Sequence, residues 1–360
     1  MAKGRVDSDN HDCIGLGPAG KTARNPRESK VKVLITGGAG FIGSHLAERY
    51  LKQGDEVFVL DDFSTGSMEN IRHLDGAPEF SGRFHHTRGS ILDRETLLEL
   101  VGICDVAVHL AAAVGVQYIL DNPLSSMVTN THGTETVLEL CNKFRKKVLL
   151  ASTSEVYGKH DHAPLLETDD CIYGSSDKFR WSYAASKLMD EFMGLAYHRK
   201  NGLPVLVVRF FNTVGPRQTG RYGMVIPRFV KQALNHEPLT VYGDGRQTRT
   251  FTHVEDVVDA LVALIAAPGA VGQVVNIGGV EEVSMLDLAR RIVAVTGSRS
   301  EIRLIPYDEA FPPDFEDMRR RVPSTAKLQG LTGKSPRSDL DRILRDVVGF
   351  FRSVPGGTFA

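Results

Sequence analysis

A glycine-rich turn restricts the possible folds of this chain more than any other feature of its sequence. The stretch VKVLITG, which begins at Val31, is apolar and rich in β-branched residues, and the stretch after Gly40 has the apolar spacing of an amphipathic helix. Gly37, Gly40 and Gly43 follow each other at intervals of three residues. Glycines let the backbone turn tightly and approach an anion at the helix N terminus, where free N–H groups and the helix dipole favour negative charge. The sequence therefore predicts a strand, a turn that binds a pyrophosphate, and a helix.

Strand-like runs alternate with helical stretches along most of the chain. The later apolar runs are EVFVLDD, VAVHLAA, KVLLAST, LPVLVVRFFN and QVVNIGG. Continuous apolar runs are typical of parallel strands that are buried on both faces. The stretches VIPRFVKQALN, VEDVVDALVALIAA and VSMLDLARRIVAVTG have helical spacing. We expect an α/β fold, a doubly wound parallel sheet with a smaller mixed α/β region in the C-terminal part.

Composition excludes several classes of partner and site. Lys and Arg together number 43 against 44 Asp and Glu, so the net charge of −1 favours neither nucleic acid nor a membrane surface as a partner. Cys13, Cys104, Cys141 and Cys171 lack the spacing of a metal site or a disulfide framework, which favours reduced thiols and no metal. Residues 1–30 lack the apolar core of a secretory signal, and the chain has no apolar run long enough to span a bilayer. We expect a soluble cytoplasmic protein.

An acidic pair supports a dinucleotide as the ligand of the glycine turn. The next apolar run ends VFVLDDF, which places Asp61 or Asp62 about twenty residues beyond the glycines. An acid at this distance binds the hydroxyls of an adenosine ribose and repels a 2′-phosphate. The pair therefore predicts NAD in preference to NADP.

A tyrosine and a lysine supply the residues for proton transfer. Tyr183 and Lys187 in WSYAASKLMDEF are four residues apart, on one face of a predicted helix. A nearby ammonium lowers the pKa of a phenol, which can then take a proton from an alcohol while hydride leaves its carbon. The pair predicts redox chemistry on a hydroxyl group.

Seven motifs, in this order, resemble those of the extended short-chain dehydrogenase/reductases, the NAD-dependent nucleotide-sugar epimerases, dehydratases and decarboxylases. They are TGGAGFIGSHL, HLAA, TNTHGT, STSEVYG, SYAASK, RFFNTVGPRQ and LTVYGDGRQTRTFTHVEDVVDA. The resemblance implies a Rossmann domain for NAD and a smaller domain for a sugar nucleotide. We therefore expect residues 1–30 to be a flexible extension, residues 31–205 to be mainly the NAD-binding domain, and residues 206–352 mainly the nucleotide-sugar region, interleaved with Rossmann strands.

The resemblance also implies which residues bind. The implied cofactor-binding residues, besides Tyr183 and Lys187, are Gly37, Gly40, Phe41, Ile42, Asp61, Asp62, Thr65, Gly66, Ser90, Ile91, Leu110, Ala111, Ala112 and Asn130. Ser90 stands where the family often has an Asp near the adenine. The implied substrate-binding residues are Asn212, Arg228, Tyr242, Gln247, Arg249 and Arg320. A homodimer is expected, because members of the family commonly pair two long helices from each subunit.

Three residues after the KVLLAST run indicate the reaction. Thr153, Ser154 and Glu155 resemble the Thr-Ser-Glu of UDP-glucuronate decarboxylases, whereas sugar 4,6-dehydratases usually present Thr-Asp-Glu. Those decarboxylases also have a late arginine before a Val-Pro-Ser type of step, and Arg321 stands there. The resemblance implies catalytic roles for Thr153, Ser154, Glu155, Tyr183, Lys187 and Arg321.

The implied reaction begins with oxidation of C4 of UDP-glucuronic acid. The resulting β-keto acid loses carbon dioxide because the electrons are delocalised into the ketone. Returning the hydride gives UDP-xylose, and early release gives UDP-4-keto-xylose. The small residues between Tyr183 and Lys187 look more like those of UDP-sugar 4-epimerases, acting on UDP-glucuronate or a UDP-hexose, which are the alternative. A non-catalytic NAD-binding regulator is a third hypothesis.

Overall fold

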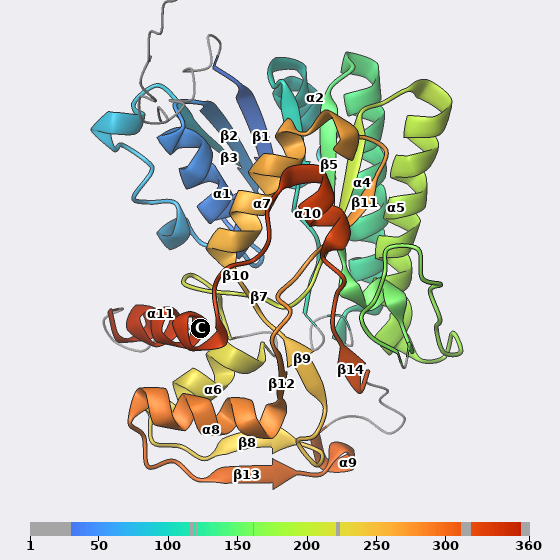
Figure 1. Cartoon of the computed structure of the whole chain (residues 1–360). Helices are drawn as coiled ribbons and strands as arrows, with labels where there is room; N and C mark the ends of the chain where they lie inside the picture. Colours follow the sequence, from blue (N-terminus) through green and yellow to red (C-terminus); the bar gives the residue numbers. More distant parts are fainter. Residues whose placement is uncertain are drawn as a thin grey trace, which may run out of the picture. The chain divides into compact units, whose positions relative to one another are not determined.

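A seven-stranded parallel sheet is the centre of the fold. The computed structural model describes residues 30–115, 119, 121–160, 162–220, 224–310 and 318–353, and Val31–Ala360 forms one compact unit. The strand order is β11-β6-β5-β4-β1-β2-β3 (Figure 1). The strands are β1 (Lys32–Thr36), β2 (Glu56–Asp61), β3 (Phe84–Arg88), β4 (Val106–His109), β5 (Lys147–Thr153), β6 (Val205–Phe210) and β11 (Val274–Ile277). All neighbouring pairs are parallel, which confirms the predicted fold class.

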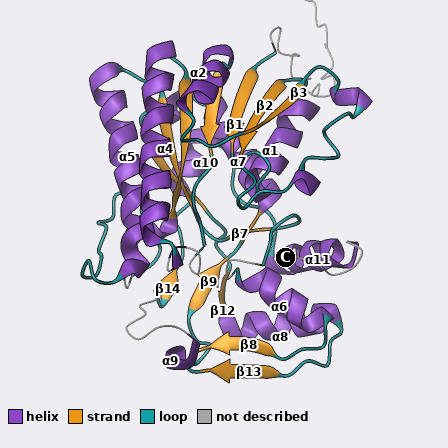
Figure 2. Cartoon of the chain, turned by 180° about the vertical axis from the view of Figure 1, so that it is seen from behind, coloured by secondary structure: helices purple, strands orange, loops and turns teal. Residues whose placement is uncertain are grey.

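Helices cover both faces of this sheet (Figures 1 and 2). Val33 and Ile35 of β1 pack into one core with α1 (Phe41–Lys52), α7 (Val254–Ala266) and α10 (Ala326–Thr332). Leu34 points the other way, into a core with α2 (Arg94–Ile103) and α4 (Pro123–Phe144), and α5 (Ser182–Asn201) lies beside α4 on the same face. Successive side chains of a strand alternate between faces, so an unbroken apolar strand supplies both cores.

A second, smaller core lies in the C-terminal part. Its helices are α6 (Val225–Leu234), α8 (Met285–Thr296) and α11 (Leu340–Ser353), which pack on the parallel pair β8 (Leu239–Tyr242) and β13 (Ile302–Ile305). Nearby are β7 (Thr213–Val214), β10 (Thr252–His253), β9 (Thr248–Thr250), β12 (Glu282–Ser284), β14 (Arg320–Arg321) and the short helix α9 (Tyr307–Ala310). The predicted helical stretches form α6, α7 and α8.

A buried ion pair holds α5 against the sheet. The carboxylate of Glu191 on α5 accepts hydrogen bonds from Nε and Nη2 of Arg209 on β6, at 2.9 and 2.7 Å. Ser152 on β5 donates its hydroxyl to the same carboxylate. Both charged side chains are almost fully buried. The interaction fixes the distance between α5, which carries Tyr183 and Lys187, and the end of β5.

Some predictions concern residues whose structure is not described. The predicted N-terminal extension, Lys30 excepted, and Cys13 lie outside the described residues. The other three cysteines are free thiols. None of the helices among the described residues is long and apolar enough to cross a membrane.

Candidate functional site

The glycine turn packs closely against neighbouring backbone at the N terminus of α1. Gly37 has φ +72°, and a Cβ there would lie 2.8 Å from the backbone nitrogen of Ala111. A Cβ on Gly43 would lie 2.2 Å from the carbonyl oxygen of Gly37. Gly40 is the N-cap, with Phe41 and Ile42 in the first turn, and that turn contains no acidic residue. Only glycine fits these close approaches, and the first turn of the helix has no acidic side chain of its own at the amide end.

Asp61, rather than Asp62, lies against this turn. Its carboxylate accepts hydrogen bonds from the backbone N–H groups of Ala39 and Phe63, both at 2.9 Å, and the residue is only 7% exposed. Gly66 passes close to the same carboxylate, because a Cβ there would lie 2.7 Å from Oδ1. Burial raises the pKa of Asp61, and the two backbone hydrogen bonds oppose this effect. Asp62 is exposed and accepts a hydrogen bond from the N–H of Ser64.

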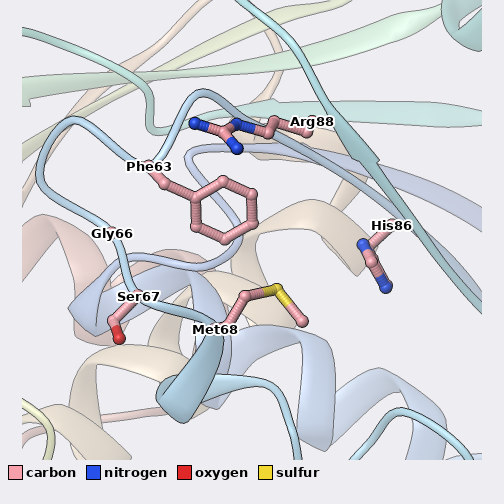
Figure 3. Close-up of a pocket in the computed structure, with 6 residues that line it drawn as sticks. All are labelled: Phe63, Gly66, Ser67, Met68, His86 and Arg88. Carbon is pink, nitrogen blue, oxygen red and sulfur yellow. The ribbon is translucent and has the colours of Figure 1, made fainter.

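A hollow of about 490 Å³ adjoins the Asp61 end of the turn (Figure 3). Its lining residues are Phe63, Gly66, Ser67, Met68, His86 and Arg88. The guanidinium of Arg88 lies 6.0 Å from the ring centroid of Phe63. Thr65, the remaining predicted residue of this loop, is exposed beside Gly66.

The loop after β4 forms the next part of the site. Asn130 on α4 accepts a hydrogen bond from the N–H of Ala113 at 2.7 Å and donates to its carbonyl at 3.3 Å. This buried amide fixes the loop that contains Leu110, Ala111 and Ala112. Ile91 is buried against Gly133 of α4, and the Ser90 hydroxyl accepts a hydrogen bond from the N–H of Leu92. These predicted cofactor residues thus lie near the carboxyl ends of β1, β2 and β4. Open parallel sheets bind ligands at that edge.

Glu155 lies between two arginines. Thr153 ends β5, its hydroxyl accepts a hydrogen bond from the N–H of Glu155, and Ser154 is buried. One oxygen of Glu155 lies 2.5 Å from Nη1 of Arg180, and the other lies 3.5 Å from Nη1 of Arg321. Burial alone would raise the pKa of Glu155, but the two positive charges outweigh it and hold the pKa at about 2.

Arg321 reaches this cluster from β14. Its Nη2 donates a hydrogen bond to the side-chain oxygen of Asn212 at 2.9 Å, and Asn212 donates to the carbonyl of Thr250. The structure therefore brings together Thr153, Ser154, Glu155 and Arg321, four of the residues implied to be catalytic. Arg180 was not predicted, although it stands only three residues before Tyr183 in the sequence.

Tyr183 and Lys187 both lie in the first half of α5, as predicted. Lys187 donates a hydrogen bond of 2.7 Å from Nζ to Asp190, and both side chains are buried. The protein's own groups raise the pKa of Tyr183, through burial first and then through the negative charges of Glu155 and Asp190. This direction is opposite to the one expected from a tyrosine–lysine pair alone, because that expectation did not include burial or the charges of Glu155 and Asp190.

Apart from Asn212, which contacts Arg321, the implied substrate residues divide into three groups. Arg228 on α6 stacks on Tyr242 of β8, with 4.2 Å between the guanidinium carbon and the ring centroid, and Gln247 donates to the carbonyl of Tyr242 at 2.9 Å. Arg249 on β9 is buried beside β14 and donates to the carbonyl of Thr248. Arg320 lies apart from them, since it is half-exposed and makes a two-bond ion pair with Glu282.

Neighbouring positions on β14 explain why Arg320 and Arg321 differ. Adjacent residues of a strand point to opposite faces, so Arg321 meets Glu155 while Arg320 meets Glu282. The run of arginines in the sequence did not reveal which of them faces Glu155.

Comparison with known proteins identifies the family. The model of the NAD-dependent epimerase/dehydratase family matches residues 33–278. The chain belongs to this family. Among the relatives of this family member, UDP-N-acetyl-alpha-D-glucosaminuronate decarboxylase of Bacillus cytotoxicus is 41% identical over 326 residues, which cover 90% of this chain and 99% of that protein. UDP-glucuronic acid decarboxylase 1 of Xenopus tropicalis is 36% identical over 327 residues, which cover 90% of this chain and 73% of that protein.

A solved structure of another epimerase/dehydratase has the same fold. UDP-glucuronic acid 4-epimerase from Bacillus cereus, in complex with UDP-glucuronic acid and NAD, superposes with a TM-score of 0.79 and 31% sequence identity. The match covers 89% of this chain and 99% of that one. Both the decarboxylases and the 4-epimerases are therefore similar to this member of the family.

Proposed function

We propose that this epimerase/dehydratase family member decarboxylates UDP-glucuronic acid through a 4-keto intermediate, giving UDP-xylose or UDP-4-keto-xylose. The observation that carries the proposal is the ionised Glu155 with Arg321 beside it at the end of β5. A second arginine, Arg180, holds Glu155 more closely, at 2.5 Å against 3.5 Å. Arg321 can therefore turn to a substrate carboxylate without leaving Glu155 unpaired.

NAD fits the cofactor half of the site. Gly37 and Gly43 let the backbone pack closely at the start of α1, as it does in proteins that bind a pyrophosphate at a helix N terminus. The buried Asp61 carboxylate can accept hydrogen bonds from ribose hydroxyls. When bound, NAD would supply oxidation of C4 and, where UDP-xylose is the product, reduction of the ketone that regenerates it, whereas release of UDP-4-keto-xylose would leave NADH. We infer that the residues from Gly37 to Asn130 named above hold it.

The chain's own residues manage protons and charge. Tyr183 accepts the proton of the C4 hydroxyl as a phenolate, so the positive charges of Lys187 and of bound NAD must offset the burial and the carboxylates that raise its pKa. The Thr153 hydroxyl donates a hydrogen bond to the same oxygen. Arg321 orients the carboxylate that leaves as carbon dioxide. Glu155 has a pKa of about 2, so near neutral pH it acts as a fixed anion and has no proton to give. We propose that it positions Arg321 and a water molecule beside Ser154.

The nucleotide part of the substrate would lie on the smaller core. Arg228, Arg249 and Asn212 supply the positive charge and hydrogen-bond donors that a diphosphate needs. Tyr242 and Gln247 lie beside Arg228 and are suited to the base or ribose. The 41% identical relative is named for a substrate with an N-acetyl group, so UDP-N-acetylglucosaminuronic acid is the second substrate to test.

We also propose that the protein forms a homodimer through α4 and α5. These helices pack side by side, and they expose Leu124 and Val128 of α4 together with Met189 and Phe192 of α5. Phe179 lies exposed next to the start of α5. Exposed large apolar side chains on two neighbouring helices are typical of an interface with a second copy.

The decisive experiment uses the purified protein, incubated with NAD and either UDP-glucuronic acid or UDP-N-acetylglucosaminuronic acid. Mass spectrometry of the nucleotide sugar would show loss of carbon dioxide, and the mass would distinguish a pentose from a keto-pentose. Tyr183→Phe serves as the control that keeps the ring and removes the proton acceptor. An unchanged mass with inverted C4 in the NMR spectrum would contradict the proposal and support the 4-epimerase, which the Bacillus cereus structure makes the alternative.

A further inference from the structure

A buried carboxylate stands next to the lysine of the tyrosine–lysine pair. Asp190 lies one turn after Lys187 on α5 and accepts its hydrogen bond at 2.7 Å. The exposed fractions of the two side chains are 3% for Lys187 and 2% for Asp190. A charge buried this deeply needs a partner of opposite sign, because removing either one leaves the other uncompensated. Asp190 is therefore part of the environment in which Lys187 works.

A chain of hydrogen bonds leads from the cofactor loop towards Asp190. The N–H of Ala111 donates to the Thr36 hydroxyl at 3.3 Å, and that hydroxyl lies 2.8 Å from Nδ1 of His109. Nε2 of His109 lies 3.2 Å from the hydroxyl of Thr134. The Thr134 hydroxyl lies beside the carboxyl of Asp190 and lowers its pKa, against the larger effect of burial, which raises it. Oδ1 of Asp190 makes no hydrogen bond among the described residues, so we infer that it is the acceptor towards which the Thr134 hydroxyl turns.

With Thr134 donating to Asp190, the hydrogen bonds of the chain all run in one direction. At the Ala111 end the N–H can only donate, and at the other end an ionised Asp190 can only accept. Burial lowers the pKa of His109 to about 3, so its ring is neutral and carries one proton. The arrangement is satisfied when Thr36 donates to Nδ1 and the proton of His109 is on Nε2, directed at Thr134. The charge on Asp190 thus selects one histidine tautomer.

We propose that Asp190 is a positioning residue, which anchors Lys187 and orders the hydrogen-bond chain that leads back to the loop after β4. No role for Asp190 was predicted from the sequence, although it stands in the stretch WSYAASKLMDEF, and it contacts Lys187 rather than the reacting atoms. Its negative charge also offsets part of the positive charge that Lys187 presents to Tyr183. Asp190 therefore keeps the ammonium in a fixed place.

Other ionisable groups surround this pair and bear on its pH dependence. Tyr183 and Glu191 lie on α5, His109 ends β4, and Glu155 follows β5. Glu191 is already engaged by Arg209. Asp190 is consequently the carboxylate that hydrogen-bonds to Lys187.

The first test measures the tautomer of His109 and does not depend on the proposed function. Long-range nitrogen–proton NMR spectra of histidine-labelled protein should show the Nε2–H form, assigned by its loss in His109→Gln. In Asp190→Asn the amide can donate to Thr134, so the Nδ1–H form should become populated. An unchanged tautomer in Asp190→Asn would overturn the proposal. If that variant does not fold, Thr134→Val should change the tautomer and Thr134→Ser should not, and identical spectra for the two would equally overturn it.

The second test, which rests on the proposed decarboxylase activity, follows kcat against pH. Without its carboxylate a buried ammonium gives up its proton more readily, so the alkaline decline of kcat in Asp190→Asn should begin about one pH unit lower or more. The KM for the UDP-sugar should stay within about twofold, because Asp190 does not contact substrate. Asp287→Asn is the matched control, since Asp287 and Arg290 form an exposed pair with the same kind of spacing. If kcat begins to decline at the same pH in Asp190→Asn and in the unmodified protein, Asp190 has only a structural role.

Discussion

At the scale of single residues, the charge of Glu155 determines what this site can do. A glutamate at the end of a buried strand would normally be a candidate proton donor, because burial favours its neutral form. Here Arg180 and Arg321 reverse that preference and hold its pKa at about 2. The acidic residue of the Thr-Ser-Glu motif is therefore an anion that organises two cations.

Replacing Arg321 should separate its role from that of an ordinary surface arginine. Arg321→Gln removes the charge that would orient the substrate carboxylate, so we expect kcat for decarboxylation to fall by about 10²–10³-fold. Arg290→Gln, in an exposed ion pair on α8, is the control and should retain the activity. Equal rates for Arg321→Gln and the unmodified protein would exclude Arg321 from the reaction.

The depressed pKa of Glu155 also predicts how stability depends on pH. A carboxyl whose pKa falls from 4.5 to about 2 on folding stabilises the protein above the unfolded value, and this contribution is lost as pH falls towards the folded value. The contribution is about 3 kcal/mol at neutral pH. The difference in unfolding free energy between the unmodified protein and Glu155→Gln should therefore narrow between pH 5 and pH 3. Denaturant titrations would measure this difference at each pH. A difference that does not change with pH would contradict the low pKa of Glu155.

At the scale of elements, α5 is useful to the site only if it is fixed against β5 and β6. The buried pair of Glu191 and Arg209, joined by Ser152, supplies that attachment. Such a pair adds little net stability compared with an apolar contact, but breaking it leaves a buried charge. The pair thus sets the position of Tyr183 relative to Thr153.

Glu191→Gln should destabilise the protein by about 3–5 kcal/mol, because Arg209 would stay buried without its carboxylate. Glu69→Gln provides the comparison, since Glu69 and Arg72 form a fully solvated pair. Thermal unfolding of the two variants should give a large decrease in Tm for the first and little change for the second. Similar Tm values would mean that the Glu191 pair does not anchor α5.

The elements also show how far the sequence could predict this structure. Apolar runs and glycine spacing predicted the parallel sheet, and helical spacing predicted α6, α7 and α8, since these patterns are local. Arg180 and Asp190 were missed because their importance comes from Glu155 and Lys187, and contacts between side chains are decided by packing. The resemblance gave Arg320 and Arg321 different roles, but it did not predict their directions, which the register of β14 against β9 sets.

At the scale of the whole molecule, the exposed apolar face of α4 and α5 predicts the assembly. Replacing Leu124 and Phe192 together by Glu places two charges on that face, where both side chains are more than half exposed. Because the charges would be buried in a dimer and solvated in a monomer, the double variant should be monomeric. Sedimentation velocity would measure the mass, with Val280→Glu, at another exposed apolar position, as the control. A double variant with the mass of a dimer would show that the interface does not lie on α4 and α5.

The order of the strands has a consequence for synthesis of the chain. The last strand of the large sheet, β11, ends at Ile277, long after its neighbour β6 ends at Phe210. While the ribosome adds the residues between them, β6 remains an unpaired edge with apolar side chains on both faces, the kind of edge that invites association between chains. The nascent protein is therefore most exposed to aggregation during this interval, and a chaperone that binds the emerging chain would have its greatest effect there.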